Sequence, residues 1–338
     1  MKRHRPPAVR LIEVAARARV SPSTASKALN GRDGMRPDTR DRVLRAAEEL
    51  GFRPNAIARG LLSGTTCAVG LLTTDNFGRF SIPILLGAEK ALSSGNMAVL
   101  LCNSQGEPAR EERYLQALVD RRVDGLIVTG RRTEDRPPVR RLPIPVVYAF
   151  APSSDPADCS VVVDQAGGAR IAVRHLRDCG RHRIAHITGP RRHRAARSRA
   201  QAATRALARA DLRLQGEVAY GEWSEMWGRS AAETLLASHP RIDGIFCGSD
   251  QVARGVVDAL TAQGRRVPDD VAVVGFDNWP VMAEASRPPL TTVDMNVEHL
   301  GRVAATKLLA AIEGDEDPGL HRLACSLVVR ESTAGETA

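Results

Sequence analysis

The residues most able to do chemistry appear first on one short segment near the N-terminus, Ser21 to Asn30. Ser21 is a good N-cap, Pro22 suits a first helical position because its missing N–H costs nothing there, and the helix is predicted to end at Leu29. Opposite its small apolar residues lies a mostly polar side, made of Pro22, Ser23, Ser26, Lys27 and Asn30. Short polar side chains of this kind are able to read base edges in the major groove of DNA.

A preceding helix is needed to hold that polar side in place. Leu11, Val14, Ala15 and Ala18 follow the spacing i, i+3, i+4 and i+7, which predicts one apolar helix face. Two short helices joined by a tight turn form a helix-turn-helix, whose second helix enters the major groove. A simple helical hairpin remains an alternative on this pattern alone.

Several stretches resemble, in the same order, the lactose-repressor and galactose-repressor (LacI/GalR) family of bacterial transcription regulators. VAARARVSPSTASKALNG and TRDRVLRAAEELGFRPNAIARGL resemble the family's DNA-binding headpiece. VGLLTTD, RRVDGLIVTG, HRIAHITGP, GSDQVARGV, VPDDVAVVGFDN and PPLTTVD resemble its regulatory domain. The resemblance spans nearly the whole chain, and several motifs in register are more specific than any one of them.

For DNA, the resemblance implies that Pro22, Ser23 and Lys27 read bases, and that phosphate contacts come from Ser21, Thr24, Ser26 and Asn30. Ser21 as a simple N-cap is the alternative. The segment NAIARGLLSG resembles the hinge helix, in which Leu61 would wedge into the minor groove with Ala58 beside it. An ordinary linker role for Leu61 stays open. Arg19 departs from the family's turn glycine, and Pro22 lacks a side-chain donor.

For a small-molecule effector, the resemblance implies a cleft shared by two lobes. Asp277 of GFDN would accept hydrogen bonds from the ligand, although capping of the next turn is an alternative. The other candidates are Asp75 and Phe80 of one loop, Arg199, Ser249, and the rings Trp223 and Trp279. Gly78-Arg79 replaces the Asn-Pro usual in that loop. Aromatic platforms beside polar groups suit the C–H face of a sugar or a planar base.

Beyond Cys67, short apolar runs alternate with segments of helical length, which is typical of parallel α/β structure. The predicted strands are Ala68–Leu72, Ala98–Cys102, Gly125–Val128, Val146–Tyr148, Ile184–Ile187, Gly244–Cys247 and Val271–Gly275. The predicted helices are Ile82–Ser93, Pro108–Arg121, Ala166–Cys179, Ala195–Ala210, Met226–Ala237, Gln251–Gln263 and Val297–Ile312.

Pattern and resemblance together predict an α/β protein in three parts. An N-terminal all-α helix-turn-helix headpiece covers 9–53, with a third helix whose Val43, Leu44, Ala47 and Leu50 close its core. A hinge helix or linker covers 54–64. Residues 66–333 form an effector-binding and dimerisation domain, a two-lobed, periplasmic-binding-protein-like (type I) core with doubly wound parallel sheets and three crossovers.

Charge is distributed unevenly along the 338 residues. Residues 1–64 hold 14 Lys and Arg against 6 Asp and Glu, a net +8 of the total +9. A basic headpiece favours phosphate contacts and salt-dependent DNA binding. The alternative to DNA binding is a basic surface that is simply exposed to solvent.

The six single cysteines show no metal spacing, so we expect neither a disulfide nor zinc, and no cofactor. No run of 18 or more apolar residues occurs, so we expect a cytoplasmic protein with no membrane segment.

The sequence therefore predicts a repressor that binds palindromic double-stranded operator DNA as a homodimer under control of a small-molecule effector, a carbohydrate. The alternatives are a constitutive DNA-binding regulator and a corepressor-dependent one with a nucleobase-like ligand. A transport receptor fits the fold but not the headpiece. An enzyme is rejected because nucleophile elbow, P-loop and GxGxxG motifs are missing, and because His182, His186 and His193 lack partners at catalytic or metal spacing.

Overall fold

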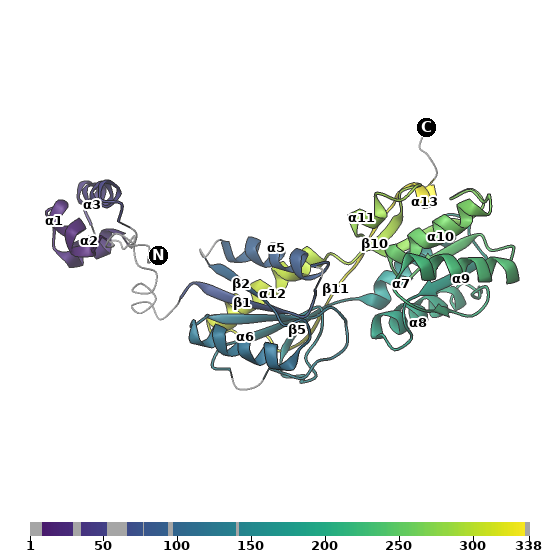
Figure 1. The fold of residues 1–338 in the computed structure, drawn as a ribbon, viewed down its shortest axis with the longest axis horizontal. Coiled ribbons are helices and arrows are strands. Elements are labelled where there is room, and N and C mark those ends of the chain that lie inside the picture. The colour runs from purple at the N-terminus through teal and green to yellow at the C-terminus, as the bar shows by residue number, and fades with distance from the viewer. Residues whose placement is uncertain are drawn as a thin grey trace, which may run out of the picture. The chain divides into compact units, whose positions relative to one another are not determined.

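The computed structural model describes residues 9–29, 35–52, 66–76, 78–93, 97–139 and 142–334. The chain divides into two compact units, 1–67 and 68–338, which are treated separately below (Figure 1). Asn30, Ala58, Leu61 and the predicted hinge 54–64 lie outside the described residues.

The N-terminal unit is a bundle of helices α1 (Leu11–Arg17), α2 (Pro22–Leu29) and α3 (Pro37–Glu49). Ser21 accepts a hydrogen bond from the Thr24 amide at 3.1 Å through its Oγ, so it caps α2 as the sequence predicts. The core consists of small side chains, which lets the short helices approach closely: Val14, Ala15, Ala18, Ala25, Ala28, Val43, Ala46 and Ala47.

The prediction is wrong for one core residue of α3. Leu44 is 44% exposed, whereas Ala46 is buried beside Val43 and Ala47. Successive residues of an α-helix are rotated by about 100°, so positions 43, 46, 47 and 50 share a face and position 44 points away. Phe52 packs against the core, as expected.

The turn between α1 and α2 places Arg19 at φ +54°, in the left-handed region. This is the position at which the family pattern has glycine. A side chain with a Cβ is disfavoured in this conformation. The headpiece therefore holds a strained turn directly before the second helix of its helix-turn-helix.

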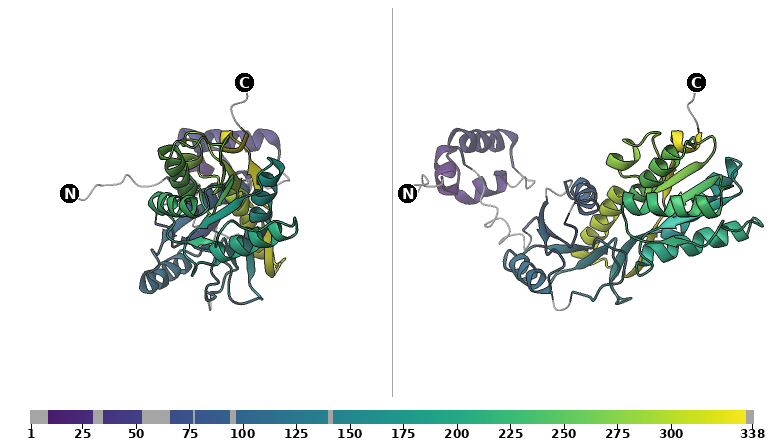
Figure 2. Two further views of the ribbon diagram at one scale, coloured as in Figure 1. Left: turned by 90° about the vertical axis from the view of Figure 1, so that its right-hand side faces the viewer. Right: turned by 45° about the vertical axis from the view of Figure 1, so that its right-hand side comes forward.

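The larger unit contains two lobes, each with one six-stranded sheet between helices (Figures 1 and 2). In lobe 1 all neighbouring strands are parallel, in the order β11-β5-β4-β3-β1-β2. Its strands are β1 (Ala68–Thr73), β2 (Ala98–Asn103), β3 (Gly125–Thr129), β4 (Val146–Ala149), β5 (Cys159–Val163) and β11 (Gly319–Leu323). Helices α5 (Ser81–Leu92) and α12 (Val297–Ile312) pack in one hydrophobic cluster, and α6 (Pro108–Asp120) packs in another.

Lobe 2 repeats this plan, with strand order β12-β10-β9-β8-β6-β7 and only β12 antiparallel to its neighbour. Its strands are β6 (Ile184–Thr188), β7 (Ala219–Tyr220), β8 (Gly244–Cys247), β9 (Ala272–Asp277), β10 (Thr291–Asp294) and β12 (Ser326–Val328). Its helices are α7 (Gln165–Asp178), α8 (Arg194–Ala208), α9 (Glu225–Ser238), α10 (Asp250–Ala262), α11 (Pro280–Ala283) and α13 (Glu331–Ala334).

The chain crosses between the lobes after β5, after β10 and after β11. The predicted fold class, with its three crossovers, is confirmed. Every predicted strand and helix of the core occurs, with ends displaced by at most about two residues. The prediction missed β5, β7, β10, β11 and β12 and the four-residue helices α11 and α13. Strand β7 has only two residues, and β11 alternates between half-buried and exposed positions. Within the described residues no helix is long and apolar enough to cross a membrane.

Replacing Arg19 by glycine should relieve the strained turn. We expect Arg19→Gly to stabilise a headpiece fragment of residues 1–64 by about 0.5–1 kcal/mol, as measured by thermal unfolding followed by circular dichroism. The matched control is Arg45→Gly, at an exposed position inside α3, which should destabilise the fragment by about 1 kcal/mol. A loss of stability in both variants would contradict the assignment of strain to Arg19.

Candidate DNA-binding helix and interlobe cleft

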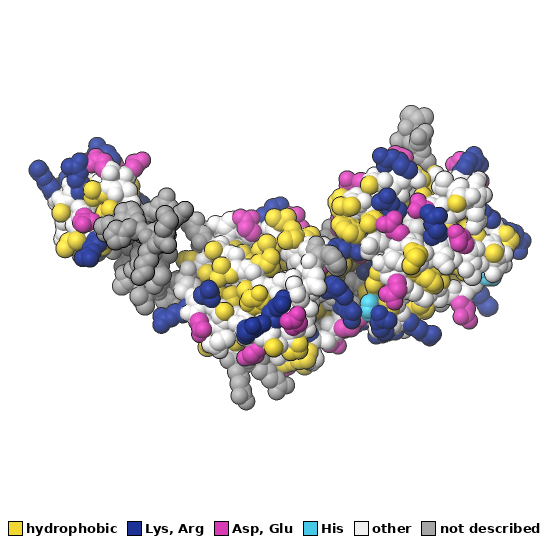
Figure 3. Space-filling model, viewed as in Figure 1, with side chains coloured by type: hydrophobic (Ala, Val, Ile, Leu, Met, Phe, Trp, Pro, Cys, Tyr) yellow, Lys and Arg dark blue, Asp and Glu magenta, His cyan; other side chains and the backbone are white. Residues whose placement is uncertain are grey.

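The outer side of α2 is available to a partner. Pro22, Ser23 and Lys27 are exposed, while Thr24 and Ser26 are half-buried. Lys and Arg side chains stand on the face of the headpiece seen in Figure 3. Exposed short side chains with one lysine, on a basic helical unit, suit a helix that enters the DNA major groove.

The larger unit contains a cleft of about 600 Å³ to which both lobes contribute. All seven residues predicted to contact an effector line it, namely Asp75, Phe80, Arg199, Trp223, Ser249, Asp277 and Trp279. The prediction missed nine further lining residues: Arg79, Arg131, Arg132, Thr133, Glu134, Phe150, His193, Ala195 and Gln251. A cleft of this size fits a small organic ligand.

Asp277, at the end of β9, is the centre of a charged cluster inside the cleft. Arg79 of lobe 1 pairs with its Oδ2, and Arg199 of lobe 2 lies 3.7 Å from its Oδ1. The side chains of Asp277 and Arg199 are only 6% and 5% exposed. Arg79 also donates to Gln251 Oε1 at 2.9 Å, so a single side chain of lobe 1 makes two contacts with lobe 2.

Arg199 is fixed by its surroundings on α8. Its Nε donates to Gln165 Oε1 at 2.8 Å, Nη1 donates to the carbonyl of Gly248, and the guanidinium lies 3.6 Å from the ring centroid of Phe276. Burial lowers the pKa of Arg199 to about 10, and the neighbouring carboxylate of Asp277 opposes that effect. The group therefore stays protonated at neutral pH.

A second buried carboxylate, that of Asp250, lies near the cluster. Asp250 accepts hydrogen bonds from Thr292 Oγ1 at 2.5 Å and from the Trp279 amide at 2.7 Å. Burial, with the nearby charge of Asp277, raises the pKa of Asp250 to about 7. Burial also raises the pKa of Asp277, while the guanidinium groups of Arg79 and Arg199 act in the opposite direction.

Aromatic faces form the walls of the cleft. The Arg79 guanidinium lies over Trp279 at 4.4 Å, and Phe80 stacks on Phe150 with centroids 4.6 Å apart. Trp223 lies so close to Gly189 that a Cβ there would come within 2.1 Å of the ring. This glycine therefore sets the position of Trp223.

Two predicted effector residues, Asp75 and Ser249, hold the helix starts beside the cleft. Asp75 Oδ2 accepts from the amides of Phe80 and Ser81 at 2.8 and 3.0 Å, and so orders the start of α5. Ser249 accepts from the Val252 amide at 3.3 Å and caps α10. Both residues lie at the cleft, but their side chains also shape the loops that form it.

A second set of contacts joins the two lobes beside the cleft. Glu134 Oε1 of lobe 1 accepts from the Arg194 amide at 2.8 Å, at the first turn of α8, and Asp135 pairs with the Arg194 side chain. Trp223 Nε1 donates to His193 Nδ1 at 2.8 Å.

Several polar atoms lining this cleft are buried without a hydrogen-bond partner among the described residues: Arg79 Nε, Thr133 Oγ1, Glu134 Oε2 and His193 Nε2. Leaving such groups unsatisfied is unfavourable. A ligand with several donors and acceptors would satisfy them.

The sequence marked Arg79 as unusual, because Gly78-Arg79 replaces the Asn-Pro usual in that loop. Glu134 and His193 follow β3 and β6 in irregular loops, where no periodicity marks a residue. In the part of the chain that the structure describes, no group of three His, Cys, Asp or Glu side chains could hold a metal ion. All six cysteines are free.

Comparison with known proteins gives two family matches. Residues 10–55 match the bacterial regulatory proteins of the lacI family, and residues 173–333 match a periplasmic binding protein-like domain. The first match covers the helix-turn-helix, and the second covers most of lobe 2 with the C-terminal part of lobe 1. These matches agree with the helical headpiece and the two-lobed core described above.

Relatives along nearly the whole chain agree with both matches. The chain is 34% identical to the ribose operon repressor of Halalkalibacterium halodurans over 96% of each protein. It is 34% identical to a transcriptional regulator CelR–cellobiose complex, with a TM-score of 0.67 and coverage of 96% of this chain and 99% of that one. It is 26% identical to the lac repressor dimer bound to operator and the anti-inducer ONPF, with a TM-score of 0.80 and coverage of 97% and 99%.

These relatives are transcriptional regulators rather than enzymes, which agrees with the prediction from the sequence. A DNA-binding headpiece, a two-lobed core with a ligand-sized cleft and relatives of full length all point to one conclusion. The chain belongs to the LacI family of bacterial transcriptional regulators, with a periplasmic-binding-protein-like effector domain.

Proposed function

We propose that this regulator is a homodimeric repressor that binds a palindromic operator and responds to a carbohydrate bound between its lobes. The observation that carries this proposal is the cleft, in which the Arg79–Asp277 ion pair crosses from one lobe to the other beside two tryptophan rings. A ligand entering there meets both lobes at once.

The lining of the cleft favours a sugar. Trp223 and Trp279 offer flat apolar faces, and polar atoms of Arg79, Glu134 and His193 lie buried without partners among the described residues. Sugars combine a C–H face with many hydroxyl groups, each able to donate and accept. One related regulator has been solved with cellobiose, and another is a ribose operon repressor.

Ligand binding would change how strongly the two lobes are held together. In the structure, Asp277 and Gln251 both contact Arg79, and Glu134 accepts from the first amide of α8 in the other lobe. A sugar that hydrogen-bonds Asp277 replaces or rearranges the first of these links. Operator affinity changes if the headpieces bind DNA differently in the two lobe arrangements, which is the requirement for allosteric control.

Exposed apolar side chains on the core support a dimer. Ile82 and Leu86 of α5 are 44% and 49% exposed, and Val281 of α11 is 61% exposed. Figure 3 shows hydrophobic side chains gathered over α5 and again over α11. Apolar patches of this kind mark protein–protein contacts. A two-fold dimer presents two copies of α2, and so reads two half-sites of a palindrome.

On DNA, Pro22, Ser23 and Lys27 are the proposed base readers, because their side chains are exposed on the outer side of α2. Ser21, Thr24 and Ser26 are the proposed phosphate contacts, and Ser21 also caps the helix. Asn30, Ala58 and Leu61 are proposed to contribute on the strength of the sequence pattern alone.

The effector proposal is tested with DNA from the protein's own promoter region. Operator affinity is measured at fixed salt against ribose, cellobiose, lactose and a set of nucleobases. We expect one sugar to change affinity tenfold or more, about 1.4 kcal/mol of coupling. Calorimetry should show that the sugar no longer binds to Asp277→Asn or Trp223→Ala.

The control is Asp258→Asn, which removes a carboxylate paired with Arg229 on the surface of α10 and should respond like the unmodified protein. A response to a nucleobase alone would replace the carbohydrate assignment. Tight operator binding with no response to any compound would favour the constitutive alternative.

The dimer proposal predicts that charge on the α5 patch separates the subunits. The double variant Ile82→Glu/Leu86→Glu should sediment as a monomer at micromolar concentration, whereas the unmodified chain should sediment as a dimer. Met226→Glu is the matched control, because Met226 is 81% exposed on α9 and is not part of the patch. A dimer in all three proteins would show that α5 is not the interface.

A further inference from the structure

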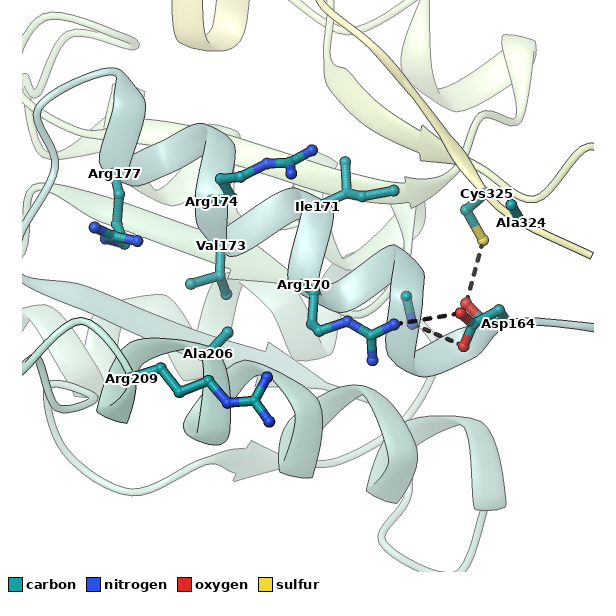
Figure 4. Close-up of a pocket in the computed structure, with 11 residues that line it drawn as sticks. Asp164, Arg170, Ile171, Val173, Arg174, Arg177, Ala206, Arg209, Ala324 and Cys325 are labelled. Atoms are coloured by element: carbon teal, nitrogen blue, oxygen red, sulfur yellow. Dashed lines mark hydrogen bonds and ion pairs between the residues drawn. The ribbon is translucent and has the colours of Figure 1, made fainter.

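A second hollow of about 480 Å³ lies on lobe 2 between α7 and α8, and it shares no lining residue with the effector cleft. Its apolar lining includes Ile171, Val173 and Ala206, of which Val173 and Ala206 face each other (Figure 4). Its remaining charged and crossover residues are Arg170, Arg174, Arg177, Arg209, Asp164, Ala324 and Cys325. The hollow therefore combines apolar side chains with four guanidinium groups.

Helix geometry explains how these arginines come together. Arg170, Val173 and Arg177 stand at i, i+3 and i+7, so they share the face of α7 that is turned toward α8 (Figure 4). Ala206 faces them from α8, and Arg209, at the C-cap of that helix, reaches toward Arg170 (Figure 4). The small side chain of Ala206 leaves the space between the helices open.

The positive charge of this hollow is largely uncompensated. Arg170 pairs with Asp164 at 3.4 Å. Arg174, Arg177 and Arg209 make no ion pair with any described residue. Like charges around one hollow repel each other, and a bound anion would offset that repulsion. Guanidinium groups bind phosphate oxygens through paired, charge-assisted hydrogen bonds.

The hollow also lies beside the segments that join the two lobes. Asp164 follows β5 at one crossover, and Cys325, at another crossover, contacts the Asp164 carbonyl through its Sγ at 3.5 Å. Gln165, the first residue of α7, accepts the hydrogen bond from Arg199 of the cleft. One helix thus carries the arginines of the hollow and a residue that holds the charged cluster of the cleft.

We propose that this hollow is a second ligand site, which takes a small polyanion bearing two phosphate groups, such as an organic diphosphate or bisphosphate. Two phosphates match guanidinium groups from two sides of the hollow, those of Arg170 and Arg177 on α7 and that of Arg209 at the end of α8, and the apolar lining accepts the carbon skeleton between them. The volume is within the range of small-molecule sites. Because the ligand would contact α7 and the crossovers, it would act on the lobe arrangement from a site separate from the effector cleft.

The test is calorimetric titration of the full chain with inorganic pyrophosphate at about 0.15 M salt, where exposed charges are largely screened beyond about 8 Å. We expect saturable binding with one site per chain. Arg177→Gln/Arg209→Gln should weaken it at least tenfold. The matched control is Arg205→Gln/Arg213→Gln, which removes the same charge from exposed positions outside the hollow.

Three outcomes would overturn the proposal. One is the absence of saturable binding by the unmodified chain. Another is equal binding in the two double variants, which would place the anion on diffuse surface charge or elsewhere on the molecule. The third is a loss of DNA affinity in Arg177→Gln/Arg209→Gln with pyrophosphate binding retained, which would make this surface a DNA contact. Thermal unfolding of both double variants checks that they are folded.

Discussion

The buried charge cluster around Asp277 is the interaction on which the arrangement of the core depends. One carboxylate holds two guanidinium groups, Arg79 from lobe 1 and Arg199 from lobe 2, and all three are largely removed from water. Removing one partner of a buried pair leaves an uncompensated charge and costs about 3–5 kcal/mol. The two lobes are therefore held together by a specific contact, and a ligand that displaces it from the cleft must replace it with contacts of its own.

The same cluster constrains the backbone that carries it. Asp277 is at φ +112°, a conformation that a residue with a side chain rarely adopts and that persists only where neighbouring contacts enforce it. Gly275, two residues earlier, leaves room for Asp250, whose Oδ1 would lie 2.3 Å from a Cβ at that position. Strand β9 thus ends in an unfavourable backbone conformation at Asp277, and this conformation places one carboxylate between the two lobes.

Much of the fold was predictable because periodicity and apolar runs depend on local sequence. Errors arose where that signal is weak, as in edge strand β11, or where an apolar residue lies off the buried face, as with Leu44. The cleft was predictable only where motifs of the family are retained. The part played by Arg79 was not, because a departure from a pattern shows that a contact changes without showing which contact replaces it. Glu134 and His193 line the same cleft only because the chain folds two separate loops together.

The most direct test of the cross-lobe contact is hydrogen–deuterium exchange of the full chain with Arg79→Ala. We expect faster exchange in lobe 2, in the segments around Gln251 and Trp279, because both lose their contact with lobe 1. Arg113→Ala, at an exposed position of α6, should leave these segments unchanged. Faster exchange confined to the loop around residue 79 would contradict the claim that this arginine holds the two lobes together.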